Sequence, residues 1–137
     1  SQIMVEKVPH NEVSSYGIVN LNGVDPKPGQ DVQIKSIIEK PSIEEAPSDY
    51  AVVGRYVLSS EIWPLFKRTP LGAGGEFQLT DTIELLMHLE DIHAYPIIGH
   101  SHDCGNKEGY VKTFIDYSLR HPSLGKAITE YVKSLKL

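Results

Sequence analysis

The segment from Tyr50 to Leu58 constrains the fold of this chain more than any other part of the sequence. It is apolar almost without interruption, and only Gly54 and Arg55 break the run. A run of this length and composition is typical of a strand that is buried on both faces. The chain must therefore cover both sides of a sheet, which favours an α/β fold.

Strand and helix patterns divide the rest of the chain into an early and a late part. Strands are predicted at 2–8, 16–20, 34–40 and 92–99, and helices at 62–66, 79–87, 107–120 and 124–135. A mobile loop is predicted for 69–75, which contains a proline and three glycines. No repeat, low-complexity tract or linker divides the chain. We therefore expect residues 1–137 to form one α/β unit, strand-rich early and helix-rich late.

Composition and charge exclude several classes of function. The chain has 137 residues, of which 40% are hydrophobic and 23% charged, as in ordinary globular domains. Its net charge of -5 argues against a nucleic-acid partner and against an anionic membrane surface. Its apolar runs are shorter than the ~20 residues that span a bilayer, and its single cysteine cannot form an internal disulfide. We expect a soluble, cytoplasmic protein.

The first residues indicate that the chain is a piece of a longer protein. A strand pattern from Gln2 to Val8 is already under way after Ser1, with no initiator methionine before it. Natural chains seldom begin within a strand, so we expect that further sequence precedes this one.

The segment Ile34–Pro41 is the first candidate for a functional site. A β-branched, apolar run ends in Glu39, Lys40 and Pro41. Because proline favours an extended residue before it, we expect Glu39 and Lys40 to face opposite sides at the mouth of the sheet. Glu39 could accept hydrogen bonds from hydroxyls and Lys40 could neutralise an anion. The alternative is a solvated charge pair before a turn.

Two further positions have residue types that suit binding. Gly17 lies within a predicted strand, where glycine commonly marks a bulge or the close approach of another group. Asp103 lies between a strand and a helix, where open α/β sheets bind ligands, and its carboxylate could hold Mg²⁺. The alternative for this segment is an Asp or Asn that caps the following helix.

Other constellations favour structural roles. His100, His102, Asp103 and Cys104 have the residue types of a zinc site, but structural zinc sites usually need a second, distant pair of ligands. We interpret Cys104 as a buried structural cysteine. The aromatic residues at helical spacing favour a role in the core over base stacking; they are Tyr110, Phe114 and Tyr117.

Six segments, taken in order, resemble the bacterial UTP–glucose-1-phosphate uridylyltransferase family. Each segment alone is a weak signal, but their order and spacing cover essentially the whole chain. They are Met4–Val8, Tyr16–Val19, Ile38–Pro41, Ala51–Leu58, Glu76–Asp81 and His102–Lys107. The resemblance implies the C-terminal, sugar-binding half of the nucleotide-diphospho-sugar transferase fold, which is Rossmann-like, with a mixed β-sheet and flanking helices.

The resemblance also implies an activity and a set of site residues. The family transfers a nucleotidyl group from UTP to glucose 1-phosphate, which gives UDP-glucose and pyrophosphate. Lys40 would be the catalytic residue and would contact the sugar-linked phosphate, while Glu39 would accept hydrogen bonds from glucose hydroxyls. The backbone of Gly17 would line the sugar site and Val52 would pack near the sugar. Asp103 would share Mg²⁺ with an aspartate of the family's N-terminal half.

The family's N-terminal half, with its Gly-rich nucleotide loop, has no counterpart in this sequence. We therefore expect the chain alone to be inactive. We also expect a homo-oligomer, because half of a shared sheet exposes an apolar edge. Two alternatives remain open: a sugar-1-phosphate nucleotidyltransferase that uses dTTP or ATP, and a non-catalytic interaction module that keeps the fold.

Overall fold

The computed structural model describes residues 1–72 and 75–135, which belong to two compact units, Ser1–His100 and Ser101–Leu137. The strands of the first unit are β1 (Gln2–Lys7), β2 (Gly17–Asn20), β3 (Val32–Gln33), β4 (Ser36–Glu39), β5 (Tyr50–Val57) and β6 (His93–Pro96). Its helices are the 3-10 helix η1 (His10–Ser15), α1 (Ile62–Phe66) and α2 (Leu79–Met87). The second unit holds α3 (Lys107–Arg120) and α4 (Gly125–Ser134).

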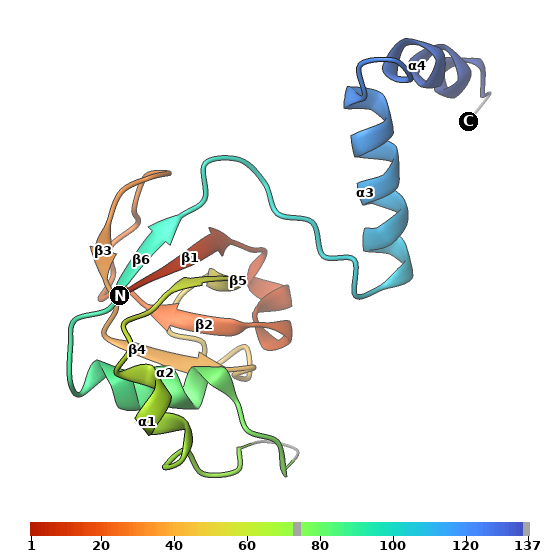
Figure 1. The fold of residues 1–137 in the computed structure, drawn as a ribbon. Helices are drawn as coiled ribbons and strands as arrows, with labels where there is room; N and C mark the ends of the chain where they lie inside the picture. The colour runs from red at the N-terminus through yellow and green to blue at the C-terminus, as the bar shows by residue number, and fades with distance from the viewer. Residues whose placement is uncertain (73–74, 136–137) are drawn as a thin grey trace. The chain divides into compact units, whose positions relative to one another are not determined.

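The strands of the first unit form one mixed sheet in the order β3-β6-β1-β5-β2-β4 (Figure 1). β1 pairs in parallel with β6 and antiparallel with β5, and the remaining pairs are antiparallel. The mixed sheet with flanking helices confirms the predicted α/β class. β3 was not expected from the sequence, because two residues carry too little pattern to indicate a strand.

The main core lies between one face of the sheet and the helices α1 and α2, which lie together beneath the sheet in Figure 1. Ile3 and Val5 of β1 and Ile83 and Leu86 of α2 are completely buried there. Their positions follow the spacing expected of a strand and of a helix with one buried face. A smaller cluster of Val13, Ile18 and Ala51 includes a residue of η1. Covering elements on both sides therefore enclose the start of β5.

The second half of β5 differs from the prediction. Tyr50 and Ala51 are buried, but Val57 is 73% exposed, so the strand is not buried on both faces along its length. The pairing also slips, because Ile3 pairs with Tyr56 whereas Val5 pairs with Val52. Gly54 lies in this irregular stretch with a φ of 70°, a conformation that glycine adopts without strain. An apolar run specifies a strand, but it does not specify how far the neighbouring elements cover it.

The second unit consists of two helices that pack against each other. The side chain of Asn106 caps α3 by accepting a hydrogen bond from the amide of Gly109 at 2.7 Å. Aromatic residues of α3 that were predicted in the core are exposed instead, as is Cys104, which was predicted to be buried; the exposed fractions of Tyr110, Phe114 and Tyr117 are 60%, 67% and 66%. Both predictions were wrong. Helical spacing defines an apolar face and not the partner that covers it, and the residue type of Cys104, which precedes α3, does not by itself specify burial.

Two sequence predictions concern loops and membranes. The loop predicted at 69–75 includes residues 73–74, which lie outside the described residues. In the part of the chain that the structure describes, no helix is both long enough and apolar enough to cross a membrane.

Candidate functional site

The candidate site begins with two residues that face each other across neighbouring strands. Gly17, the first residue of β2, is the register partner of Glu39, the last residue of β4. The apolar residues before Glu39 hold β4 in the sheet, since Ile37 is buried in the main core. The sheet therefore delivers the Glu39 carboxylate to the place where β4 ends.

Two more side chains complete this cluster. The hydroxyl of Thr80, in the first turn of α2, donates a hydrogen bond to Oε2 of Glu39 at 3.1 Å. A Cβ atom built on Gly17 would lie 3.0 Å from Oε2 of Glu39, 3.1 Å from Cγ2 of Thr80 and 3.8 Å from Cγ2 of Val52. Glycine is therefore the residue that fits between these groups, and a ligand here would meet its backbone. We call Gly17, Glu39, Val52 and Thr80 the Glu39 cluster.

The surroundings of Glu39 include a hydrogen-bond donor and the N-terminal end of a helix. Glu39 is only partly exposed, and its hydrogen-bond donor Thr80 lies at the N-terminal end of α2, where the helix dipole favours negative charge. Burial, and to a smaller extent the charge of Glu39, raise the pKa of Tyr56 on β5. The cluster thus offers an acceptor of hydrogen bonds beside a neutral phenol.

Lys40 follows Glu39 directly, but its backbone differs from the prediction. Its φ is 45°, in the left-handed region, and its amide donates a hydrogen bond to the carbonyl of Tyr16 at 3.0 Å. The expectation of an extended residue that continues the alternation of β4 was wrong, because the strand ends at Glu39. Lys40 is exposed, and within the described residues its side chain has no hydrogen-bond or ion-pair partner. Its ammonium group is available for an anion.

Asp103 belongs to the second unit, whereas the Glu39 cluster belongs to the first. Its Oδ1 accepts a hydrogen bond from the amide of Gly105 at 2.8 Å, and Nδ2 of Asn106 lies 3.5 Å from its Oδ2. Asn106 and not Asp103 caps α3, so the capping role weighed for this segment falls to the asparagine. The carboxylate of Asp103 is exposed and keeps lone pairs for a ligand.

The donor set of Asp103 fits Mg²⁺ as a single carboxylate ligand. Mg²⁺ commonly takes one or two protein carboxylates and fills its remaining positions with water or phosphate oxygens. Among the residues that the structure describes, no group of three or more His, Cys, Asp or Glu side chains could hold a metal ion. The described residues therefore do not form a complete metal site by themselves, and Asp103 could supply only one of the ligands.

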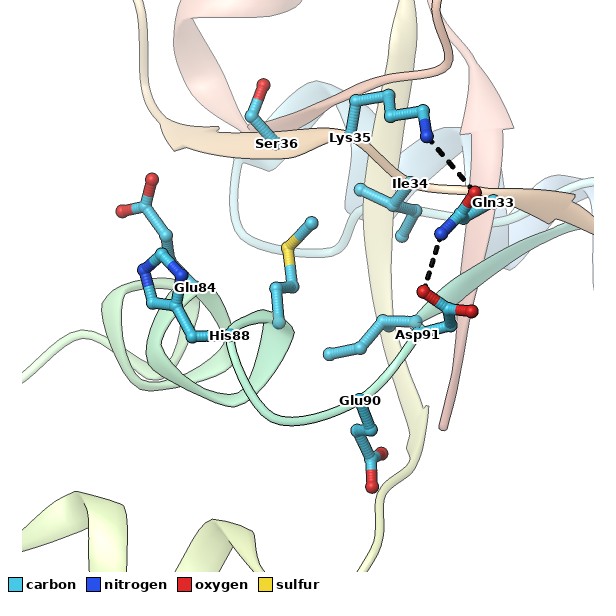
Figure 2. Close-up of a pocket in the computed structure, with 10 residues that line it drawn as sticks. Gln33, Ile34, Lys35, Ser36, Glu84, His88, Glu90 and Asp91 are labelled. Atoms are coloured by element: carbon cyan, nitrogen blue, oxygen red, sulfur yellow. Dashed lines mark hydrogen bonds between the residues drawn. The ribbon is translucent and has the colours of Figure 1, made fainter.

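A cavity of about 230 Å³ lies elsewhere, between the β3–β4 segment and the end of α2 (Figure 2). On one wall Lys35 donates to Gln33 at 3.1 Å, and Gln33 donates to Asp91 at 2.6 Å, as the dashed lines show. Glu84 of α2 and His88, the residue that follows α2, line the other side. None of the residues of the Glu39 cluster lines this cavity. Gln33 therefore bridges Lys35 and Asp91 by hydrogen bonds within the wall of the cavity.

The fold agrees with comparisons to known proteins. Residues 1–118 match the model of the nucleotidyl transferase family. The chain belongs to this family of enzymes.

Individual relatives show which members of the nucleotidyl transferase family this chain is similar to. The UTP–glucose-1-phosphate uridylyltransferase of Haemophilus influenzae is 49% identical over 135 residues, which are 98% of this chain and 46% of that protein. A UTP-bound UGPase from Acinetobacter baumannii matches with a TM-score of 0.88 at 42% identity, over 98% of this chain and 45% of that one. A UDP-glucose pyrophosphorylase complexed with UDP-glucose matches with a TM-score of 0.79 at 35% identity, over 88% of this chain and 44% of that one. The chain therefore spans less than half the length of these relatives.

The structure brings together three of the predicted site residues, Gly17, Glu39 and Val52. Lys40 follows Glu39 directly in the chain, and Asp103 is in the other unit. Sequence reasoning missed Thr80, although Thr80 lies within the segment Glu76–Asp81 that contributed to the family resemblance. Its contact with Glu39 joins residues 41 positions apart, and no local pattern indicates such a contact.

Proposed function

We propose that this chain forms the sugar-1-phosphate side of a UTP–glucose-1-phosphate uridylyltransferase. The observation that carries the proposal is the Glu39 cluster, where a carboxylate, a bare glycine backbone and the side chain of Val52 converge. The names of the relatives support the choice of glucose 1-phosphate as the sugar and of UTP as the nucleotide.

In this proposal each residue of the site recognises a different part of the sugar phosphate. Glu39 accepts hydrogen bonds from sugar hydroxyls, which is chemistry that a charged carboxylate does well. Gly17 lets the sugar approach the backbone, and Val52 contacts the apolar face of the ring. The ammonium group of Lys40 neutralises the phosphate.

The reaction is a direct displacement at phosphorus. A phosphate oxygen of glucose 1-phosphate attacks the α-phosphorus of UTP, the bond from that phosphorus to the bridging oxygen of the β-phosphate breaks, and pyrophosphate leaves. No covalent enzyme intermediate forms, so catalysis depends on positioning and on neutralising charge. Bound Mg²⁺ would add positive charge at the phosphates, and Asp103 would supply one carboxylate oxygen to it. Lys40 holds the attacking phosphate.

Calorimetric titration of the 137-residue chain with glucose 1-phosphate tests the proposal. Lys40→Ala removes a charge-assisted hydrogen bond, so its affinity falls by about tenfold or more. Lys40→Gly also lacks the amine, so its affinity for glucose 1-phosphate should fall by the same factor as that of Lys40→Ala. It should nevertheless be about 1 kcal/mol more stable than Lys40→Ala in urea, because glycine adopts the left-handed conformation without strain.

Wild-type affinity that survives unchanged in both Lys40 variants would contradict the assignment of the phosphate contact. A wild-type chain that binds inorganic phosphate as tightly as glucose 1-phosphate would contradict the assignment of the sugar contacts.

We further propose that the chain alone does not catalyse the transfer. The sequence contains no Gly-rich phosphate loop of the kind that would orient UTP. Release of UDP-glucose from both substrates and Mg²⁺ by the isolated chain would show the opposite. Because its substrates would be UTP and a sugar phosphate, we place the protein in the cytoplasm.

Self-association is the last part of the proposal. α3 carries aromatic side chains that are 60% to 67% exposed, and exposed apolar patches commonly mark contact surfaces. A second copy of the chain is the partner we propose for this face. Analytical ultracentrifugation should show a dimer or larger species, and Phe114→Glu should shift it to the monomer. A monomeric wild-type chain at every concentration would refute the proposal.

A further inference from the structure

The carboxylate of Glu39 is held by one donor, and that donor is buried. Thr80 is only 6% exposed and donates its hydroxyl to Oε2 of Glu39 at 3.1 Å. Within residues 1–72 and 75–135, no other hydrogen bond to the Glu39 carboxylate is formed. One oxygen is thus engaged inside the protein and Oε1 remains available for a ligand.

The two branches of Thr80 act on different neighbours. The hydroxyl branch reaches Glu39, while Cγ2 would lie 3.1 Å from a Cβ built on Gly17. Because threonine is branched at Cβ, its χ1 rotation is restricted, and packing of the methyl group fixes the direction of the hydroxyl. The backbone of Gly17 closes the other side, since a Cβ there would lie 3.0 Å from Oε2.

We infer that Thr80 is a positioning residue, which fixes Oε2 of Glu39 so that Oε1 meets a sugar hydroxyl. This inference rests on the proposed binding of a sugar 1-phosphate by Glu39. A glutamate side chain has several rotatable bonds and loses rotamer freedom when it binds a ligand. Thr80 restricts that freedom before binding, and such preorganisation raises affinity without a direct contact to the ligand.

The helix that carries Thr80 gives the arrangement its rigidity. Thr80 is the second residue of α2, and α2 packs against β4, the strand that carries Glu39. Ile83 and Leu86, which lie further along α2, are completely buried in the main core. The distance between the hydroxyl and the carboxylate is therefore set by packed elements and not by a loop.

Thr80→Val tests the inference, because valine keeps the branched shape and removes the hydroxyl. We expect its affinity for glucose 1-phosphate, measured by calorimetry, to fall about fivefold to tenfold, while the affinity for inorganic phosphate stays within about twofold. Thr80→Ser keeps the hydroxyl and should restore most of the affinity. In the Glu39→Gln background, Thr80→Val should have little further effect, since the group it positions is altered.

Thr82→Val is the matched control. Thr82 is another buried threonine of α2, but its hydroxyl contacts the hydroxyl of Thr69 at 2.8 Å and donates to the carbonyl of Gln78 at 3.3 Å, and it does not contact Glu39. This variant loses the hydrogen bonds of a buried hydroxyl and should still bind glucose 1-phosphate within about twofold of wild type. An equal loss of affinity in the Thr80 and Thr82 variants would overturn the inference, because it would indicate a general structural effect.

The NMR signal of the Glu39 carboxyl carbon in the free protein separates this inference from the proposed function. It should shift in Thr80→Val and stay in place in Thr82→Val. Wild-type binding with an unchanged signal and unchanged affinity in Thr80→Val overturns the positioning role and leaves the proposed function standing. A wild-type chain that does not bind glucose 1-phosphate overturns the proposed function. In that case the NMR signal still tests the positioning of the carboxylate, and an unchanged signal in Thr80→Val would overturn it as well.

Discussion

The helices α2 and α3 have similar sequence patterns and opposite surroundings. Both place large apolar residues at helical spacing, but Leu86 of α2 is completely buried and Phe114 of α3 is 67% exposed. α2 packs against β4 of the sheet, whereas α3 packs against α4, the other helix of its own unit. The difference teaches that helical periodicity defines an apolar face and leaves open what covers it.

The same difference separates the two candidate sites. Glu39 is held by a strand, a glycine and a buried threonine of the packed unit. Asp103 lies before α3 in a turn where its carboxylate accepts a hydrogen bond from Gly105. The first site is therefore preorganised by tertiary packing, while the second depends on local hydrogen bonds.

Removal of a core side chain should give the largest effect. Leu86→Ala opens a cavity in the main core and should lower the free energy of unfolding by about 2–5 kcal/mol. Phe114→Ala, the matched change on α3, should alter it by less than about 0.5 kcal/mol in the monomeric chain. Urea denaturation followed by circular dichroism measures both. Similar losses in the two variants, measured at a concentration where the chain is monomeric, would break the contrast between the helices.

A buried hydroxyl of the first unit should give an intermediate effect. The hydroxyl of Tyr50 donates to Asp25 at 2.6 Å, and burial, followed by this hydrogen bond, raises the pKa of Tyr50 to about 12. Tyr50→Phe should therefore lower the free energy of unfolding by about 1 kcal/mol at pH 8. Tyr117→Phe is the matched change in the second unit, where the ring is 66% exposed, and should have almost no effect.

The pH dependence of the Tyr50 effect has a definite sign. The folded state favours the protonated phenol, so Tyr50 contributes its full stability below its ordinary pKa of 10.0 and loses it as the pH rises to about 12. The difference between wild type and Tyr50→Phe should shrink over this window. A difference that grows from pH 10 to 12 would exclude the buried hydrogen bond as its cause.

Loss of a helix cap should give the smallest effect, confined to the second unit. Asn106→Ala removes the acceptor of the Gly109 amide and should destabilise α3 by about 0.5–1 kcal/mol. Hydrogen exchange should increase at the start of α3 and stay unchanged in β1 and α2. Lys107→Ala, one residue further along, keeps the cap and serves as the control. Faster exchange in the sheet would show that the two units are energetically coupled.

Much of the first unit could be predicted from local pattern. Alternating and continuous apolar runs indicated β1, β2, β4, β5 and β6, and helical spacing indicated α2, since these patterns reflect which side chains face a core. The two-residue strand β3 was not predicted, because it is too short to show a periodic pattern. The exposure of the second half of β5 was not predicted, because the burial of a strand depends on the elements that pack against it.

The sequence by itself determined that a strand ends at the segment from Glu39 to Pro41 and that Gly17 belongs to another strand, because these are properties of neighbouring residues. Only the tertiary structure decided that Gly17 and Glu39 are register partners, that Thr80 donates to Glu39 and that Lys40 has a φ of 45°. These features arise when strands and helices distant in sequence pack together. Strand register and helix packing then select one arrangement among several that the local pattern allows.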